Sequence, residues 1–183
     1  MPVQHASEPI LKSMGRKGSG KEYLELIKRL RKEIPDITLR STIIVGFPGE
    51  SDENFEELKD FVKQASFDYL GCFEYSREEG TKAAEMKDQI SDGVKHSRAN
   101  EIRDIADAIS LDKLHEKLGH VFEVLIEGKE DGRYFGRAQF QAPDVDGYVF
   151  ISEFDEKLVK PGQLVNVKIQ DQEGYDLVGS VND

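Results

Sequence analysis

The sequence predicts a mixed α/β unit followed by a small all-β barrel. In residues 1–118, short runs rich in β-branched residues alternate with segments whose apolar residues recur every three or four positions, the spacing of one helical face. After residue 118 the pattern becomes an alternation of apolar and polar residues between turn-forming residues, which is typical of short strands. Strands that alternate with helices pair in parallel through right-handed crossovers, so the first unit should be an α/β sheet or part of a barrel.

The first unit should begin with an extended stub and end with a long helix. Ser7 is expected to cap a short helix, while Ser19 and Glu22 form the capping-box pattern of the next helix, which Pro35 stops. The long helix should turn Val94 inward. We expect the stub over residues 1–5, helices over 7–14, 19–33, from 51 onward and over 91–118, and strands over 38–45 and 67–75.

The second unit, residues 119–183, should fold as a five-stranded antiparallel barrel. Its strand candidates are separated by turn signals such as Lys160-Pro161-Gly162. Short strands at this regular spacing fit a small closed barrel. We expect them over residues 120–127, 133–140, 147–151, 163–169 and 175–181.

The charge of the chain is unevenly distributed. The formal net charge is −11, and residues 119–183 hold 13 acidic and 6 basic side chains, a balance of −7. Because a nucleic-acid surface is normally basic, this acidity disfavours RNA binding by the second unit. It favours a basic protein partner, although a solubilising surface charge would also account for the composition.

The sequence offers no metal or disulfide site built from several cysteines. Cys72 is its one cysteine and is expected to be a small core residue, because it falls within a predicted strand. The histidines show no metal-ligand spacing, and His96, His115 and His120 should lie on the surface. We find no apolar run of roughly 18 residues and no signal-peptide pattern, so we expect no membrane span and a cytoplasmic location.

A glycine-containing turn over residues 46–50 is the first candidate for a binding site. It follows a strand of the first unit, and ligands of α/β sheets and barrels bind at the carboxyl ends of the strands. Gly46 and Gly49 would let the backbone approach a ligand closely. An ordinary tight turn into a helix has the same composition, so the turn alone does not decide the function.

Three segments of the first unit resemble consecutive strand ends of the radical S-adenosylmethionine (SAM) methylthiotransferases. They are residues 2–5 (PVQH), 39–50 (LRSTIIVGFPGE) and 75–81 (YSREEGT), in that order. The second unit resembles the TRAM domain of these enzymes, an OB-like barrel, and its residues 136–137 and 142–147 are similar to the branch that modifies a ribosomal protein. The resemblance implies the C-terminal half of a radical SAM (β/α) barrel over residues 1–118, followed by a TRAM domain over residues 119–183.

The resemblance also implies SAM as a cofactor. In the family, a loose G-x-I-x-G-type motif packs on the adenosyl part of SAM, and Ile44, Gly46 and Glu50 correspond to its conserved positions. Thr42 stands where the first glycine would be, and Glu50 lies one residue further out than the generic spacing. The candidates for SAM contact are Gln4, His5, Arg40, Ile44, Gly46, Glu50, Tyr75 and Ser76.

Some of these candidates have a second interpretation. The Arg40 guanidinium suits bidentate contact with a carboxylate of SAM or of an aspartate substrate, but a salt bridge at the closed end of the barrel would also account for it. Tyr75 and Ser76 are expected at the adenine pocket, although Tyr75 could instead serve barrel packing. Gln4 and His5 should lie near the SAM ribose and the substrate.

The chain departs from the family in its cysteines. The family binds one 4Fe-4S cluster through a C-x-x-x-C-x-x-C loop early in the barrel and a second through an N-terminal domain, and Cys72 matches neither set. We therefore assign no catalytic residue and no metal ligand to this chain. We expect both clusters to be held by a missing N-terminal part of the same protein, and the chain to be inactive alone.

The resemblance implies a parent enzyme that adds a methylthio group to the β-carbon of an aspartate in a small-subunit ribosomal protein. The acidic barrel would dock this basic substrate, with Glu127, Asp144 and Asp146 as candidate docking residues. One alternative is a fragment of the sibling enzyme that methylthiolates an adenosine of transfer RNA, against which the acidic barrel counts. The other is a non-catalytic binding module that contains a TRAM domain.

Overall fold

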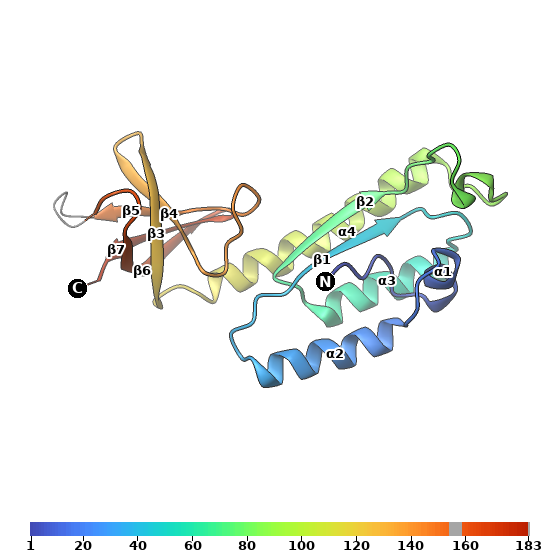
Figure 1. Cartoon of the computed structure of the whole chain (residues 1–183), viewed down its shortest axis with the longest axis horizontal. Coiled ribbons are helices and arrows are strands. Elements are labelled where there is room, and N and C mark those ends of the chain that lie inside the picture. The colour runs from blue at the N-terminus through green and yellow to red at the C-terminus, as the bar shows by residue number, and fades with distance from the viewer. Residues whose placement is uncertain (154–158, 183) are drawn as a thin grey trace. The chain divides into compact units, whose positions relative to one another are not determined.

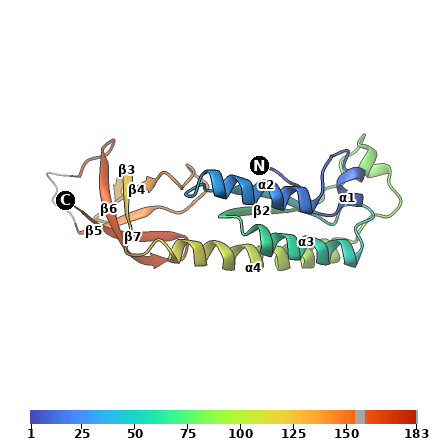
Figure 2. The same cartoon turned by 90° about the horizontal axis from the view of Figure 1, so that it is seen from below.

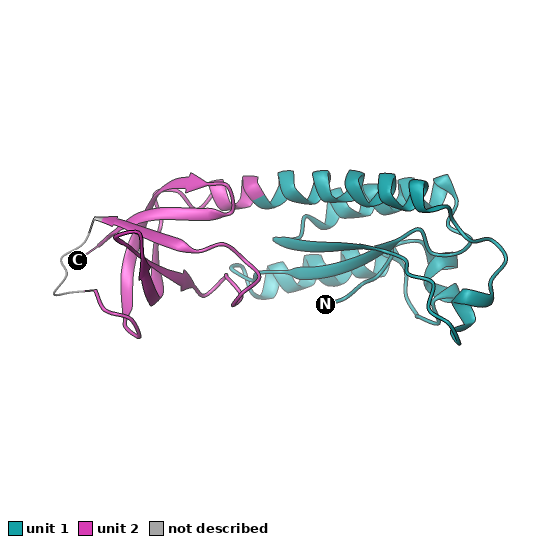
Figure 3. Ribbon diagram, turned by 90° about the horizontal axis from the view of Figure 1, so that it is seen from above, with its two compact units in different colours: residues 1–110 teal, residues 111–183 magenta. Residues whose placement is uncertain are grey.

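The computed structural model describes residues 1–153 and 159–182 in two compact units (Figure 3). The first unit is Met1–Ser110 and the second is Leu111–Asp183. The division falls inside the last helix of the first unit, α4 (Asp92–His115), whereas the sequence suggests a boundary after that helix at residue 118. The long helix thus supplies residues to both units.

The first unit contains two parallel strands that pack against helices (Figures 1 and 2). Arg40 of β1 pairs with Tyr69 of β2, and the register continues to Val45 and Glu74. Gln4 adds a parallel bridge to Ile43 on the other edge of β1, so the extended stub occupies the position of a preceding strand. The elements are α1 (Glu8–Ser13), α2 (Gly20–Glu33), β1 (Arg40–Val45), α3 (Asp52–Ala65), β2 (Tyr69–Glu74), η1 (Lys82–Glu85) and α4.

Alternation along β1 separates a covered face from an open one. Ser41, Ile43 and Val45 are buried against the helices, whereas Arg40, Thr42 and Ile44 are only partly buried. A strand inside a complete parallel barrel is buried on both faces. In this chain the helices cover one face only, and the other face borders the hollow described below.

Helix α3 shows why its sequence folds as predicted. The Ser51 hydroxyl accepts a hydrogen bond from the Asn54 backbone N–H, and the Asn54 side chain accepts one from the Ser51 N–H, a complete capping box. Its apolar stripe is buried in the core of the first unit. The stripe consists of Phe55, Leu58, Phe61 and Val62.

Two local predictions for the other helices were wrong. Ser7 makes no side-chain cap for α1, because its hydroxyl instead accepts a hydrogen bond from Asn54 Nδ2 of α3 at 3.0 Å. Val94 is 40% exposed, since the amino-terminal end of α4 turns this side chain away from the core. The Ser19 cap of α2 is observed, with Ser19 Oγ accepting from the Glu22 N–H.

The second unit is a closed barrel of the five predicted strands. They are β3 (Val121–Glu130), β4 (Arg133–Ala138), β5 (Val149–Glu153), β6 (Leu164–Glu173) and β7 (Asp176–Val181), in the order β3-β4-β5-β7-β6. All neighbouring pairs are antiparallel except β5 and β7, which run parallel and so correct the expectation of a wholly antiparallel barrel. This order places the third and fifth strands side by side, as in an OB-type barrel.

Apolar side chains fill the interior of the barrel, and a glycine lets two of its strands pair closely. Its core includes Val124, Ile126, Ile151 and Ile169, each almost completely buried. Gly136 of β4 lies where an added Cβ would meet the backbone carbonyl oxygen of Leu125 at 2.1 Å. A side chain at this position would therefore push β3 and β4 apart.

The predictions about single histidines and the cysteine are confirmed. His96, His115 and His120 are exposed, and Cys72 is buried in β2. Among the described residues, no helix combines the length and the hydropathy that crossing a bilayer requires.

Candidate functional site

A hollow of about 640 Å³ lies at the carboxyl ends of β1 and β2. Its apolar wall comes from the open face of the two strands and from the residues that follow them, namely Ile44, Phe47, Phe73 and Tyr75. Phe73 is 59% exposed, which is unusual for a phenylalanine on a strand. A mostly apolar hollow with a few polar groups is the usual character of a small-molecule site.

Polar groups lie at the rim of this hollow. Gln4 and Ser76 line it from the two strand ends. Arg16, after α1, and Lys82, in η1, add two cationic side chains to the lining. Arg16 also donates from Nη2 to the carbonyl oxygen of Pro2 at 2.7 Å, which ties the segment after α1 to the extended stub.

Gln4 has a backbone conformation that is rare for a residue with a side chain. Its φ is +68°, in the left-handed region. Two hydrogen bonds with β1 hold it there, from the Gln4 N–H to Thr42 O at 2.9 Å and from the Ile44 N–H to Gln4 O at 2.8 Å. Such strain is retained where the surrounding structure fixes it, often at ligand sites. Here it accompanies a side chain that lines the hollow.

Tyr75 lines the hollow, and its hydroxyl group makes no hydrogen bond with the described residues. Its ring packs edge-on against Phe47 with centroids 5.3 Å apart, and Lys95 Nζ lies 5.5 Å from the ring centroid. The Tyr75 Oη is buried and has no hydrogen-bond partner among the described residues. Because an unpaired buried hydroxyl costs free energy, a ligand that pairs with Oη would recover that cost.

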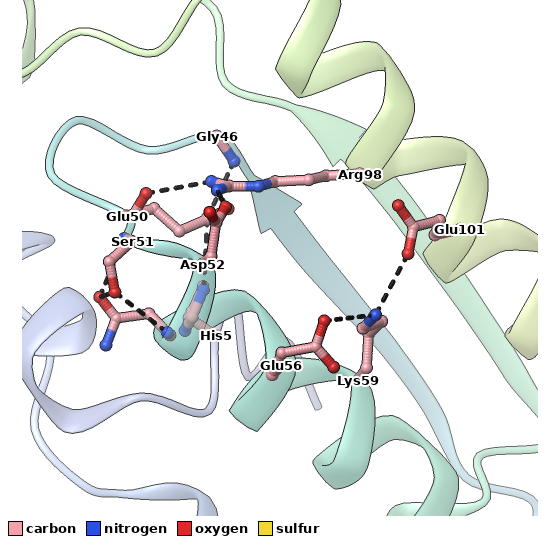
Figure 4. Close-up of polar contacts among 10 residues, drawn as sticks. His5, Gly46, Glu50, Ser51, Asp52, Glu56, Lys59, Arg98 and Glu101 are labelled. Carbon is pink, nitrogen blue, oxygen red and sulfur yellow. Dashed lines mark hydrogen bonds and ion pairs between the residues drawn. The ribbon is translucent and has the colours of Figure 1, made fainter.

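Beside the hollow, Glu50 is buried at the centre of a charged network (Figure 4). One carboxylate oxygen, Oε2, accepts from the Gly46 N–H at 2.8 Å, and the other, Oε1, accepts from Arg98 Nη1 at 2.7 Å. Arg98 Nη1 also donates to the Glu50 carbonyl oxygen, and its Nη2 donates to Asp52 Oδ1 at 2.6 Å. The network ties the turn after β1 to α4, far along the chain.

His5 completes this network from the extended stub. It is fully buried, and its Nδ1 accepts a hydrogen bond from the Ser7 N–H at 3.0 Å. An imidazole that accepts at Nδ1 carries its proton on Nε2, by assignment from this network. His5 Nε2 lies 3.4 Å from Glu50 Oε2 but is not aligned for a hydrogen bond.

The structure divides the SAM candidates into three groups. Those that line the hollow are Gln4, Ile44, Tyr75 and Ser76. Those that do not line it, but belong to the turn or to the buried network, are His5, Gly46 and Glu50. Arg40 stands apart at the amino end of β1, with its guanidinium 4.6 Å from the centroid of the Tyr69 ring.

Several residues at the site were missed by the sequence analysis. Phe73 and Arg16 line the hollow, and Arg98 holds the turn through Glu50. The alternation of β2 could have assigned Phe73 to the face that carries Tyr75, because residues two apart share a face. Arg98 gave no local signal, since its partner lies 48 residues earlier in the chain.

The three docking candidates of the barrel differ in their hydrogen bonds and in their exposure. Glu127 receives two hydrogen bonds from the Arg137 guanidinium, one of them from Nε at 2.9 Å, and this lowers the pKa of the Glu127 carboxyl. Asp146 Oδ2 accepts from the Ala142 N–H at 2.7 Å and so stabilises its own loop. Asp144 is exposed and has a φ of +59°.

The residues present do not fit an iron–sulfur cluster. Within the described part of the chain, no three histidine, cysteine or acidic side chains are grouped so that they could hold a metal ion. Burial raises the pKa of the Cys72 thiol to about 12, so this single cysteine stays protonated. No step of a reaction can therefore be assigned to a cluster held by these residues.

Comparison with known proteins supports the resemblance described above. Residues 1–62 match the radical SAM superfamily, and residues 118–181 match the TRAM domain. Over 183 residues the chain is 48% identical to a protein of Clostridium kluyveri named ribosomal protein uS12 methylthiotransferase RimO, covering 100% of this chain and 41% of that protein. Over its whole length the chain is thus similar to a protein named as a methylthiotransferase, and its two ends match the radical SAM superfamily and the TRAM domain.

Other relatives carry the same name. The protein of Lachnoclostridium phytofermentans is 46% identical over 182 residues, covering 98% of this chain and 41% of its own length. That of Acetivibrio thermocellus is 46% identical over 183 residues, covering 99% of this chain and 40% of its own length. The chain thus spans about two fifths of the length of the curated relatives it matches.

Proposed function

We propose that the chain is part of an enzyme that adds a methylthio group to the β-carbon of an aspartate in ribosomal protein uS12. The hollow at the ends of β1 and β2 carries this proposal, because it combines an apolar wall with the strained Gln4 and the unpaired Tyr75 hydroxyl. It lies in a unit that begins with the radical SAM match, in a chain whose relatives are named for uS12 methylthiolation.

The residues of the hollow fit the adenosyl part of SAM. Ile44, Phe47 and Tyr75 would contact the adenine and exclude water, and Gln4 and Ser76 would hydrogen-bond its polar edges or the ribose. In this family one SAM molecule would supply the methyl group and another would supply the 5′-deoxyadenosyl radical. The chain's own residues would bind and orient the cofactor, which is the usual contribution of a protein to cofactor chemistry.

Glu50, Arg98 and His5 would act as positioning residues. None of the three lines the hollow, yet Glu50 fixes the Gly46 N–H and Arg98 anchors that carboxylate to α4. His5 lies next to Gln4 in the chain, and its Nε2 lies 3.4 Å from Glu50 Oε2. We infer that the network holds the turn and the strained Gln4 in the geometry that shapes the hollow.

The chain alone is proposed to bind SAM without reacting. Its single cysteine cannot provide the several thiolates that a 4Fe-4S cluster requires, so the cluster ligands would come from the remainder of the protein. The acidic second unit supports a basic protein substrate over transfer RNA.

Isothermal titration of SAM into the purified chain tests the cofactor site. We expect saturable binding that weakens by roughly 2- to 10-fold in Tyr75→Phe, which removes only the hydroxyl, the scale of one neutral hydrogen bond. Tyr175→Phe, in the barrel, is the matched control and should bind SAM like the unsubstituted chain. Absence of binding, or equal affinity in Tyr75→Phe, would contradict the placement of SAM in this hollow.

A further inference from the structure

The outer surface of the barrel carries a cluster of aromatic rings. Phe135 of β4 pairs in register with Phe150 of β5, and Tyr148 precedes β5. The ring centroids of Phe135 lie 5.2 Å from Tyr148 and 6.3 Å from Phe150, and all three side chains are partly exposed. These rings face away from the apolar core, to which the intervening residues of both strands contribute.

Two arginines flank the rings on the same face of β4. Arg133 and Arg137 alternate with Phe135 along the strand, and the Arg133 guanidinium lies 4.6 Å from the centroid of the Phe150 ring. We call Arg133, Phe135, Arg137, Tyr148 and Phe150 the aromatic face. Strands β4 and β5 are the second and third strands of the barrel, the pair whose face binds oligonucleotides and oligosaccharides in OB-type folds.

The charges of this face are already paired. Hydrogen bonds to Glu127 raise the pKa of the Arg137 guanidinium, and the negative charge of Asp144 adds to this effect. Arg133 Nη1 lies 3.6 Å from Glu173 Oε2. Because both guanidiniums have carboxylate partners and the unit has a balance of −7, the face offers little free positive charge to a phosphate backbone.

Aromatic rings with paired arginines have instead the composition of a protein interface. Tyrosine, phenylalanine and arginine are enriched at the centres of such interfaces, where they often contribute most of the binding free energy. The negative balance of the unit favours cationic side chains of the partner, which can stack on the exposed rings. Glu127 and Glu173 hold the two arginines, and the exposed Asp144 belongs to the excess of negative charge.

We propose that the aromatic face is the docking surface for a basic, lysine- and arginine-rich segment of the protein substrate. This inference rests on the proposed function and assigns the recognition of uS12 to the outer strands β4 and β5. Of the three docking candidates taken from the sequence, Glu127 and Asp144 border this face through Arg137. The rings contribute affinity, and the carboxylates steer the basic partner toward them.

Binding of purified uS12 from Clostridium kluyveri to the whole chain tests this surface. We expect Phe150→Ser and Tyr148→Ser each to weaken binding about tenfold or more, as for central interface residues. Val121→Ser, a 46% exposed apolar residue at the start of β3, is the matched control and should stay within about twofold. Asp144→Asn should mainly slow association and reduce its dependence on salt.

Two further measurements show whether weaker uS12 binding reflects an unfolded variant or a preference for RNA. Circular dichroism establishes that each variant is folded, and Tyr148→Ser, which lies outside β5, serves if Phe150→Ser unfolds the barrel. A single-stranded oligouridine is offered as a competing probe. Three outcomes would overturn the docking surface. The ring variants could bind uS12 as tightly as the unsubstituted chain, or the unsubstituted chain could fail to bind uS12. The oligouridine could also bind more tightly than uS12 through the same rings.

The SAM titration separates this inference from the proposed function. Ring variants that lose uS12 but retain SAM binding support the aromatic face. Retained SAM binding without any effect of the ring variants on uS12 leaves the proposed function standing and removes only the docking surface. If the unsubstituted chain does not bind SAM, the result counts against the proposed function alone, because the rings belong to the other unit.

Discussion

The two units of this chain are stabilised in different ways. Buried polar and charged side chains are concentrated in the first unit, among them His5, Glu50, Lys95 and Arg98. In the described part of the second unit the core is apolar, and its buried polar side chain is Gln141, which bonds the Ala138 N–H at the end of β4 and the Gly147 carbonyl oxygen. The first unit thus depends on a network of charges beside its hollow, and the second on strand register and close packing.

This difference indicates where geometry is fixed for binding. A buried ion pair adds little net stability compared with apolar packing, but it is costly to break. The Glu50–Arg98 pair holds a turn at the wall of the hollow, whereas the barrel core has no comparable pair among the described residues. Breaking each kind of interaction should therefore affect the two units separately.

The largest effect is expected from Arg98→Met, which leaves the Glu50 carboxylate buried without its cation. The first unit should lose about 3–5 kcal/mol of unfolding free energy, the cost of an uncompensated buried charge. Urea unfolding followed by circular dichroism gives the total loss, and hydrogen exchange measured by mass spectrometry locates it in the first unit.

Two variants serve as controls for this prediction. Lys59→Met breaks a surface ion pair with Glu56 and Glu101 and should change stability little. The double variant Glu50→Gln with Arg98→Met should lose less than the sum of the two single variants, because no buried charge remains. A loss in Arg98→Met no larger than that in Lys59→Met would show that the buried network is not important for stability.

The next effect is expected in the barrel from Gly136→Ala. Its new methyl group would lie against the Leu125 carbonyl oxygen, so pairing of β3 and β4 must open, at a cost of about 1–3 kcal/mol. Gly93→Ala, in α4 with no neighbour within 4 Å, should instead be neutral or stabilising by up to about 1 kcal/mol. Thermal unfolding compares the two, and equal melting temperatures would refute the argument from close packing.

Cys72 tests how completely the first unit excludes solvent. Burial raises its thiol pKa from 9.0 to about 12, so the folded thiol stays protonated at pH values where the unfolded one ionises. Its contribution therefore favours unfolding increasingly as the pH rises above the unfolded pKa. Ellman's reagent should react slowly with the native chain and rapidly in urea, and rapid native labelling would contradict a closed core around β2.

The smallest effect concerns the ion pair between Glu127 and Arg137. Hydrogen bonds from Arg137 lower the Glu127 pKa, so the stabilisation is present above the unfolded pKa of the carboxyl and is lost as the pH falls through the folded pKa. Arg137→Gln should cost about 0.2–1 kcal/mol near neutral pH, the range for a partly exposed pair. The difference in urea midpoints should vanish in acid, and a difference that persists there would mean that Arg137 acts through packing.

Local sequence patterns predicted the helices and strands well, because the formation of these elements depends on residues that are close in sequence. The capping-box pattern at Ser19 marked the start of α2, and turn residues such as Pro161 separated the five barrel strands. The strand ends at Gly46 and Tyr75 were recognised by resemblance, and the structure brings the residues around them to one side of the sheet. The cap at Ser7 failed because a side chain 47 residues away takes its hydroxyl.

The sequence by itself determined the two units, their elements, the single buried cysteine and the acidity of the barrel, since each follows from composition or short periodicity. Only the tertiary structure decided that Glu50 turns toward Arg98 instead of the hollow, that Phe73 and Arg16 line it, and that β5 pairs in parallel with β7. It also brought the rings at 135 and 150 together. These contacts join residues far apart in the chain, and which faces meet depends on the packing of whole elements, which no local pattern encodes.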